Sequence, residues 1–198
     1  MSFVIYIGQK AFDIIKSDNV EAFKQYPIIE NDKFTFYAFY TAIETDAIEI
    51  VKYMISKKIN PLTIEFDAEN DEENSPFVFA ASSNAIKLIK FFHEKYGFDV
   101  NMTDSQECSC LFCAAERGAL ETAKYLVENG ADIEAEGDLR MTPLAIAIRN
   151  GNNDVAKYLI EQGANTKAIC EIEEGFEYDM VGLAKLFQND EMVEYIAT

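Results

Sequence analysis

Residues 142–151 read TPLAIAIRNG, and residues 109–118, 33 positions earlier, read SCLFCAAERG. The similarity continues beyond these stretches, because KYLIEQGAN at 157–165 lies 33 positions after KYLVENGAD at 124–132. Several coincident shifts of one length mark an internal repeat. A period in the range of about 20–50 residues indicates an array of small structural units, each packed against its neighbours.

Each unit carries the signals of two short helices. Thr142 is a good helix N-cap, and Pro143 suits the first helical position, where its missing N–H leaves no hydrogen bond unmade. An i, i+3, i+4 stripe that begins at Leu144 makes one side of this helix apolar, and Gly151 ends it. The stretch Asp154–Gly163 repeats this arrangement. Helices this short are marginal alone, so neighbouring units must bury their apolar sides against one another.

On these residues the chain resembles the ankyrin-repeat family, which has a period of 33 and the pattern Thr-Pro-Leu-His-x-Ala. Residues Thr142–Ala147 match this pattern, with Ala145 in place of the histidine. Upstream, SPFVFA at 75–80 fits the same frame. Downstream, Asp179–Ile196 aligns at a shift of 37, and the extra residues predict a longer loop around 171–177.

The repeat frame divides the chain into six units, of which the first and last are degenerate. Their approximate bounds are 8–30, 33–65, 71–104, 105–137, 138–170 and 175–198. The resemblance implies an all-α solenoid of stacked helix-turn-helix units with projecting β-turn fingers, in a single domain over residues 1–198. Degenerate end units are expected, because a terminal repeat must present a solvated outer face.

Composition limits what such an array can bind. The 198 residues hold 17 Lys and Arg against 35 Asp and Glu, a net charge of −18. Nucleic acid and anionic membranes require a basic face, so neither is an expected partner. A single His excludes a zinc site that needs two imidazoles. The short apolar N-terminal run fits no signal peptide, which favours a cytoplasmic protein.

Three of the four cysteines crowd into Cys108–Cys113, a spacing that could supply thiolate ligands to a metal. In the repeat frame, however, Cys113 aligns with the core position of Ile146, and Cys110 aligns with Pro143 at a helix start. Buried free cysteine behaves as a small apolar residue. We therefore expect core cysteines and neither a metal nor another cofactor.

The resemblance implies a concave face, made of finger loops and inner helices, that binds another protein. Acidic runs at 67–74 and 171–179 fall in loops that the frame places on one edge, either as a solvated edge or as a surface that steers a basic partner. Phe34 and Phe36 fall at finger positions, and the alternative for these two residues is a place in the core. The candidate contact residues are Phe34, Phe36, Glu44, Asp71, Glu72, Asn74, Ser105, Gln106, Glu116, Arg117, Asp138, Leu139, Met141, Arg149, Asn150, Phe176 and Tyr178.

These features predict a non-catalytic protein-binding module that is monomeric when free and whose partner has a basic surface. The sharper hypothesis is an acidic inhibitor or immunity protein that masks a basic toxin or nuclease. Three alternatives stay open at this point. One is a generic scaffold or effector with an unrelated partner, and another is a metal protein built on the cysteine cluster. The third is a purely structural crosslinking protein, which would self-associate.

Overall fold

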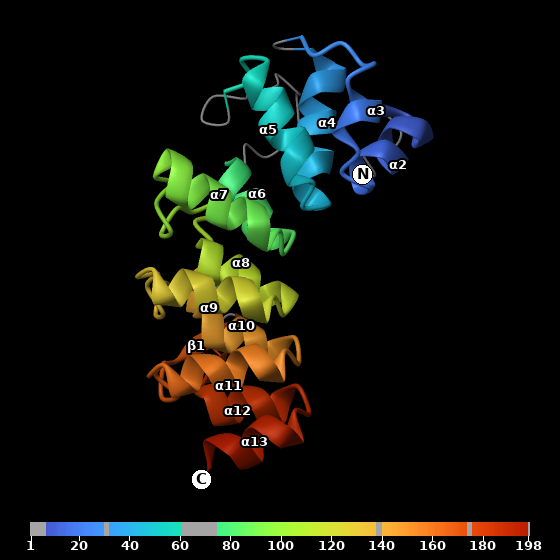
Figure 1. Cartoon of the computed structure of the whole chain (residues 1–198). Helices are drawn as coiled ribbons and strands as arrows, with labels where there is room; N and C mark the ends of the chain where they lie inside the picture. Colours follow the sequence, from blue (N-terminus) through green and yellow to red (C-terminus); the bar gives the residue numbers. More distant parts are fainter. Residues whose placement is uncertain (1–6, 30–31, 61–74, 138–139, 174–175, 198) are drawn as a thin grey trace. The chain divides into compact units, whose positions relative to one another are not determined.

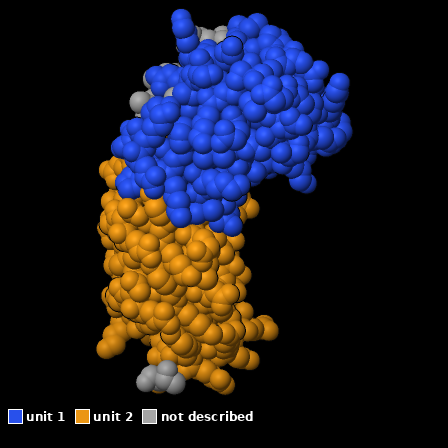
Figure 2. All heavy atoms as spheres, in the orientation of Figure 1, with its two compact units in different colours: residues 1–97 blue, residues 98–198 orange. Residues whose placement is uncertain are grey.

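The computed structural model describes residues 7–29, 32–60, 75–137, 140–173 and 176–197. These residues are mainly helical, with one two-stranded hairpin near the C-terminal end (Figure 1). The chain divides into two compact units, residues 1–97 and residues 98–198, which Figure 2 draws in different colours.

Residues 1–97 contain three helical hairpins among the described segments, each made of an inner helix followed by an outer helix. The inner helices are α2 (Gln9–Lys16), α4 (Lys33–Glu44) and α6 (Pro76–Ser82), and the outer helices are α3 (Val20–Phe23), α5 (Ile48–Ser56) and α7 (Ile86–Tyr96). Helix α4 contacts both α2 and α6, and α3 contacts α5. The inner helices of this unit therefore stack in chain order, and α3 stacks on α5 in the same way.

Residues 98–198 repeat this arrangement. The inner helices are α8 (Cys110–Arg117), α10 (Pro143–Arg149) and α12 (Met180–Leu186), and the outer helices are α9 (Leu120–Glu128), α11 (Asn153–Glu161) and α13 (Asp190–Ile196). Helix α10 contacts both α8 and α12, and α11 contacts both α9 and α13. The predicted all-α array of stacked hairpins is confirmed within each unit. Among the described residues, no helix is both long and apolar enough to cross a bilayer.

The helix starts follow the local signals of the sequence. The Thr142 hydroxyl accepts the Ala145 backbone N–H at 3.2 Å, and the Ser109 hydroxyl accepts the Phe112 N–H at 3.1 Å. Asp179 caps α12 in the same way. Each cap satisfies a backbone donor that the first helical turn leaves without an intrahelical partner. The repeat frame is therefore visible in the caps as well as in the apolar stripes.

Helix α4 corrects one expectation. Phe34 and Phe36 were expected in a finger loop, but both lie in the first turns of α4, which begins earlier than the other inner helices because the Asp32 carboxylate accepts the Thr35 N–H at 3.3 Å. The Phe34 ring stacks on Tyr26 at a centroid distance of 5.4 Å. Phe36 lies 4.6 Å from the Tyr40 ring. Both side chains are half-buried, as the alternative of a place in the core implies.

Within the longer loop predicted around 171–177, the structure forms a β-hairpin. Strand β1 (Cys170–Glu173) pairs antiparallel with β2 (Phe176–Tyr178), with Cys170 opposite Tyr178. Apolar and acidic residues alternate along both strands, which is the period-2 pattern of a strand. This hairpin occupies the finger position of the last repeat.

In residues 1–97, an aspartate at the turn within one hairpin ties it to the next. Asp18 and Asp46 adopt the left-handed region, with φ of 48° and 53°. The Asp46 carboxylate accepts the backbone N–H groups of Lys87 (3.3 Å) and Leu88 (3.1 Å) in the first turn of α7. Asp18 makes the equivalent pair of bonds to the first turn of α5, at 3.1 and 3.0 Å. These carboxylates satisfy helix donors of the neighbouring hairpin and favour its positive dipole end.

In residues 98–198, the tie runs in the opposite direction. The turn residues are Gly118 and Gly151, with φ of 68° and 72°. Asn152, just before α11, donates its side-chain N–H to two carbonyls in the last turn of α8, at 2.8 and 2.9 Å. Asn189, just before α13, donates to the Ile148 carbonyl at 3.2 Å.

At Gly118 the two kinds of tie exclude each other sterically. A Cβ atom at Gly118 would lie 2.7 Å from Oδ1 of Asn152, so the asparagine tie requires glycine at that turn. Asn152 is the residue just before the outer helix of its hairpin. In the hairpins that follow the Asp18 and Asp46 turns, the residue at this position is alanine, namely Ala47 and Ala85. The side chain that joins neighbouring hairpins is thus supplied by one of the two positions at a time.

Replacing Gly118 by alanine should destabilise the protein more than the same change at Gly151. Both variants place alanine in the left-handed region, which costs about 1–2 kcal/mol. At Gly151 the added Cβ meets nothing within 4 Å, whereas at Gly118 it collides with Asn152 and adds about 1–3 kcal/mol. Urea denaturation of G118A and G151A measures the difference. Adding N152A to G118A should recover part of the extra loss, and equal losses in the two single variants would contradict the steric explanation.

Candidate functional site

The first finger of residues 98–198 is the tight turn at 103–109. The Asp104 carboxylate accepts the N–H groups of Gln106 (2.9 Å) and Cys108 (2.8 Å), and Glu107 adopts a positive φ of 62°. A side chain that binds two backbone donors of its own turn holds the turn in one conformation. The exposed residues at its tip are Ser105, Gln106 and Glu107.

The second finger is closed by a hydrogen bond from the Gly137 N–H to the Met141 carbonyl at 2.9 Å. A Cβ atom at Gly137 would lie 3.2 Å from Cys108 Sγ and from the Phe112 ring, so this finger packs closely on the preceding repeat. Met141 was a predicted contact residue, but it is only 1% exposed and belongs to the core. The predicted contact residues Asp138 and Leu139 lie outside the described residues.

The third finger is the β1–β2 hairpin. Phe176 is 59% exposed, and Tyr178 is half-buried beside Cys170. The Arg140 guanidinium lies 4.0 Å from the Glu177 carboxylate, which joins the second and third fingers through exposed side chains. In the repeat frame Glu107, Arg140 and Glu177 occupy the same position on successive fingers, so they define one column of side chains.

The finger segments carry a large excess of negative charge. Segments 98–109, 130–142 and 163–179 contain 12 Asp and Glu but only two basic residues, Arg140 and Lys167. Over the whole of residues 98–198 there are 20 of the 35 acidic residues and 7 of the 17 Lys and Arg. The net charge of the chain is therefore concentrated in this unit, and within it more than half of the carboxylates occur in the fingers.

Some finger carboxylates have structural work. Asp104 holds the first finger in one conformation, and Asp179 caps α12. The Glu134 carboxylate accepts the Asn165 N–H of the following repeat at 2.7 Å. Others lie exposed at the finger surface, and of these Glu136 and Glu177 share the single cation of Arg140, at 3.8 and 4.0 Å. Glu107, Glu136 and Glu177 are exposed on the three fingers.

The C-terminal ends of the inner helices add exposed side chains of mixed chemistry. Glu116 and Arg117 end α8, and Arg149 and Asn150 end α10. All four side chains are exposed. The Asn150 side chain donates to the Glu116 carbonyl at 3.1 Å, so residues of two successive repeats meet at this end.

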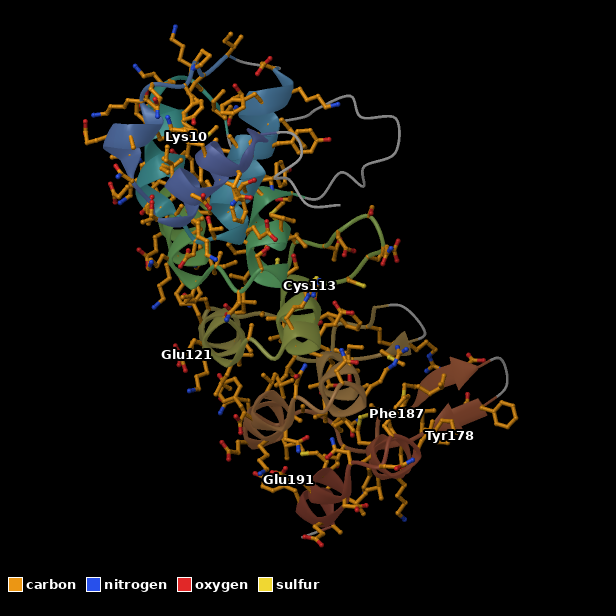
Figure 3. The ribbon with its side chains drawn as sticks, turned by 90° about the vertical axis from the view of Figure 1, so that its right-hand side faces the viewer. Lys10, Cys113, Glu121, Tyr178, Phe187 and Glu191 are labelled. Atoms are coloured by element: carbon orange, nitrogen blue, oxygen red, sulfur yellow. The ribbon has the colours of Figure 1, made fainter. Side chains whose placement is uncertain are left out.

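The last repeat supplies two apolar residues that the sequence prediction missed. Leu186 and Phe187 are 45% and 39% exposed, and the Arg149 guanidinium lies 5.9 Å from the centre of the Phe187 ring. The alignment at a shift of 37 already places these two residues opposite Arg149 and Asn150. In Figure 3, Phe187 and Tyr178 lie on the side of the hairpin, away from Glu121 and Glu191 on the outer helices.

The remaining predicted residues are not brought together with these. Phe34, Phe36 and Glu44 belong to residues 1–97, where Glu44 is exposed at the end of α4. Asp71, Glu72 and Asn74 lie outside the described residues. The candidate site that the described structure assembles is therefore the set of fingers and inner-helix ends of residues 98–198.

The cysteine cluster lies in the core and not in a site. All four cysteines are free and buried, and Cys110 and Cys113 lie on α8 with 0% and 6% exposure. Burial raises the pKa of Cys113 to about 12 and raises that of Cys110 as well. A thiol that stays protonated is a poor nucleophile and metal ligand. Within the described segments, no three His, Cys, Asp or Glu residues are arranged to hold a metal ion.

Stacked helical hairpins with finger loops define a helical-repeat protein built for interaction. A family model described as ankyrin repeats (3 copies) matches residues 77–170, which contain the strongest repeats of the sequence. Residues 77–170 are therefore ankyrin repeats, and ankyrin repeats act as protein–protein interaction modules.

Similar proteins of known name include two toxins of Latrodectus tredecimguttatus and one yeast protein. The chain is 25% identical to alpha-latrocrustotoxin-Lt1a over 107 residues and 32% identical to alpha-latroinsectotoxin-Lt1a over 106 residues, each 54% of this chain and 7% of the toxin. It is 26% identical over 105 residues to the probable 26S proteasome regulatory subunit p28 of Saccharomyces cerevisiae, which is 52% of this chain and 45% of that protein. The chain thus spans less than half the length of these relatives.

The burial of the thiols predicts their reactivity. At pH 8 the native protein should react with a thiol reagent such as DTNB far more slowly than the unfolded protein, in which all four cysteines become accessible.

The raised thiol pKa values mean that the unfolded chain loses thiol protons at a lower pH than the folded chain. Stability should therefore fall as the pH rises above the ordinary thiol value of 9.0, toward about 12. Rapid labelling of Cys113 in the native protein would contradict this account.

Proposed function

We propose that this protein binds a partner protein with a basic surface through the fingers and inner-helix ends of residues 98–198, and that binding masks that surface, as an inhibitor or immunity protein would. The observation that carries the proposal is the charge of the fingers, with 12 acidic and two basic residues. The chain acts in this proposal as a single, non-catalytic ankyrin-repeat domain, monomeric until it meets its partner.

Electrostatics supports a basic partner over a neutral one. Surface charge of one sign steers an oppositely charged protein and raises the association rate, and charges at the rim of an interface act mainly on that rate. Glu107 and Glu177 are exposed at the first and third positions of the finger column, with Arg140 between them, and Glu136 lies beside Arg140. When a basic surface binds this column, its lysine and arginine side chains lose bound water and contact several carboxylates at once.

Preorganisation supports binding as the main activity. The first finger is held by the Asp104 hydrogen bonds, and the second by the Gly137 bond to Met141. The third is a paired hairpin. A surface that is already ordered loses little conformational entropy when a partner binds. The exposed Phe176 and Phe187 add aromatic contact area, and aromatic residues are frequent hot spots of interfaces.

Masking follows from the same chemistry. A protein that acts on phosphates presents lysine and arginine side chains, and acidic fingers can occupy such a surface in place of the phosphates. The four free, buried cysteines need no oxidising compartment, so the proposal assigns the protein to the cytoplasm. A generic scaffold with an unrelated partner is the competing function, and it predicts no dependence on the finger carboxylates.

Removing finger carboxylates should weaken partner binding more than removing the same charge elsewhere. The E107Q/E177Q variant changes two exposed finger residues, and E128Q/E194Q changes two exposed residues of the outer helices α9 and α13. We expect the first variant to bind about tenfold more weakly, mainly through slower association, and the control to bind nearly as the natural protein does. Surface plasmon resonance against the captured partner measures both rates.

The partner itself is obtained by a pull-down at about 50 mM NaCl and again at about 500 mM NaCl, where surface charges are strongly screened. The proposal expects a basic protein that is retained at the lower salt and released at the higher. A tight partner that is acidic, or whose binding ignores both salt and the E107Q/E177Q change, would refute the masking role and favour the scaffold alternative.

A further inference from the structure

The outer helices of residues 1–97 carry a charge opposite to that of the chain. Segments 48–58 and 86–97 contain six lysines and only two carboxylates, Glu49 and Glu94. All six lysines are exposed. We call this set the lysine face, and its members are Lys52, Lys57, Lys58, Lys87, Lys90 and Lys95.

Helices α5 and α7 contribute to one continuous surface. The Lys52 ammonium, on α5, lies 5.7 Å from the centre of the Phe91 ring on α7, and the Lys95 ammonium lies 5.1 Å from the centre of the same ring. Lys57 lies 5.4 Å from the centre of the Tyr53 ring. Both rings are half-buried, so the lysine face alternates ammonium groups with aromatic surface.

The fold does not require four of these six lysines. In the repeat frame, Lys57 and Lys95 occupy the position of Asn129 and Gln162 in the units of residues 98–198. Lys87 stands where those units have a carboxylate. The outer-helix segments 119–130, 152–163 and 189–197 hold seven carboxylates and two lysines. Lys52 and Lys90 align with Lys124 and Lys157, so these two belong to the repeat pattern. The other four lysines stand where those units have other residues, so packing does not explain them.

Only part of this positive charge is neutralised. Lys52 pairs with Glu49 at 2.8 Å, and Lys87 lies 3.8 Å from Asp46, whose carboxylate already binds the start of α7. Among the residues that the structure describes, no carboxylate lies within ion-pair distance of Lys57, Lys58 or Lys95. These three ammonium groups are available to an external anion.

We propose that the lysine face is a second docking surface, whose occupant is a short acidic segment of a partner protein that also carries an aromatic or aliphatic side chain. The ammonium groups take its carboxylates, and the Tyr53 and Phe91 rings take its apolar side chain. Nucleic acid and anionic membrane fit less well, because their dense charge extends beyond the face and is repelled by a chain of net charge −18. The lysine face belongs to residues 1–97 and the finger site to residues 98–198. Together with the proposed function of the fingers, on which this step rests, this means that the chain joins a basic protein to an acidic one.

A defined probe tests the lysine face directly. The probe is a fluorescein-labelled peptide of glutamates with one central phenylalanine, and its binding to the full chain is followed by fluorescence anisotropy at about 50 mM NaCl. The K57Q/K95Q variant removes two unpaired ammonium groups, and K167Q/K185Q removes the same charge from exposed residues of 98–198. We expect at least a tenfold, charge-driven loss of affinity in the first variant and nearly unchanged affinity in the second (about tenfold is the effect of a few charge contacts).

Glutamine suits these positions because Gln162 already occupies the equivalent place in another repeat, and circular dichroism verifies that each variant is folded. Failure of the natural protein to bind the peptide, or equal losses in the two variants, would overturn the proposal. So would tighter binding to single-stranded DNA of the same length or to phosphatidylserine vesicles. The E107Q/E177Q variant should bind the peptide as the natural protein does, which keeps this test separate from that of the finger site.

Discussion

Each described helical hairpin closes through a residue in the left-handed region, and the side chain at that turn determines how the hairpin is joined to the next. Asp18 and Asp46 reach forward to the donors of the next outer helix, whereas Gly118 leaves room for Asn152 to reach back. Short helices cannot satisfy their own ends or bury their own faces. The array depends on this exchange between neighbours as much as on its apolar core.

The hairpins themselves could be predicted because their signals are local. Thr142, Pro143 and Gly151 fix a helix start and stop within ten residues, and the structure places the cap and the turn where these residues predict them. The departures arise where contacts between units decide the outcome. Met141 occupies a variable finger position, yet the finger packs so closely on the preceding unit that its side chain is buried.

Other features needed the structure because they join residues far apart in sequence. The Asn152 tie spans 36 and 37 positions, and no local pattern distinguishes it from an ordinary helix start. Leu186 and Phe187 were missed for a different reason. They lie in a degenerate repeat, where the alignment is correct but the residues depart from the Thr-Pro-Leu pattern. The net charge of −18 likewise concealed an arrangement in which acidic fingers and a lysine face occupy different units.

The two kinds of tie limit how such an array can evolve by shuffling hairpins. A hairpin whose turn carries aspartate cannot precede one that begins its outer helix with Asn152, because the two side chains would occupy the same space. A glycine turn followed by alanine would leave both hairpins without a tie. A breakpoint between Gly118 and Asn152 would separate this turn from its matched successor, so at this place the inherited module is the junction between two hairpins.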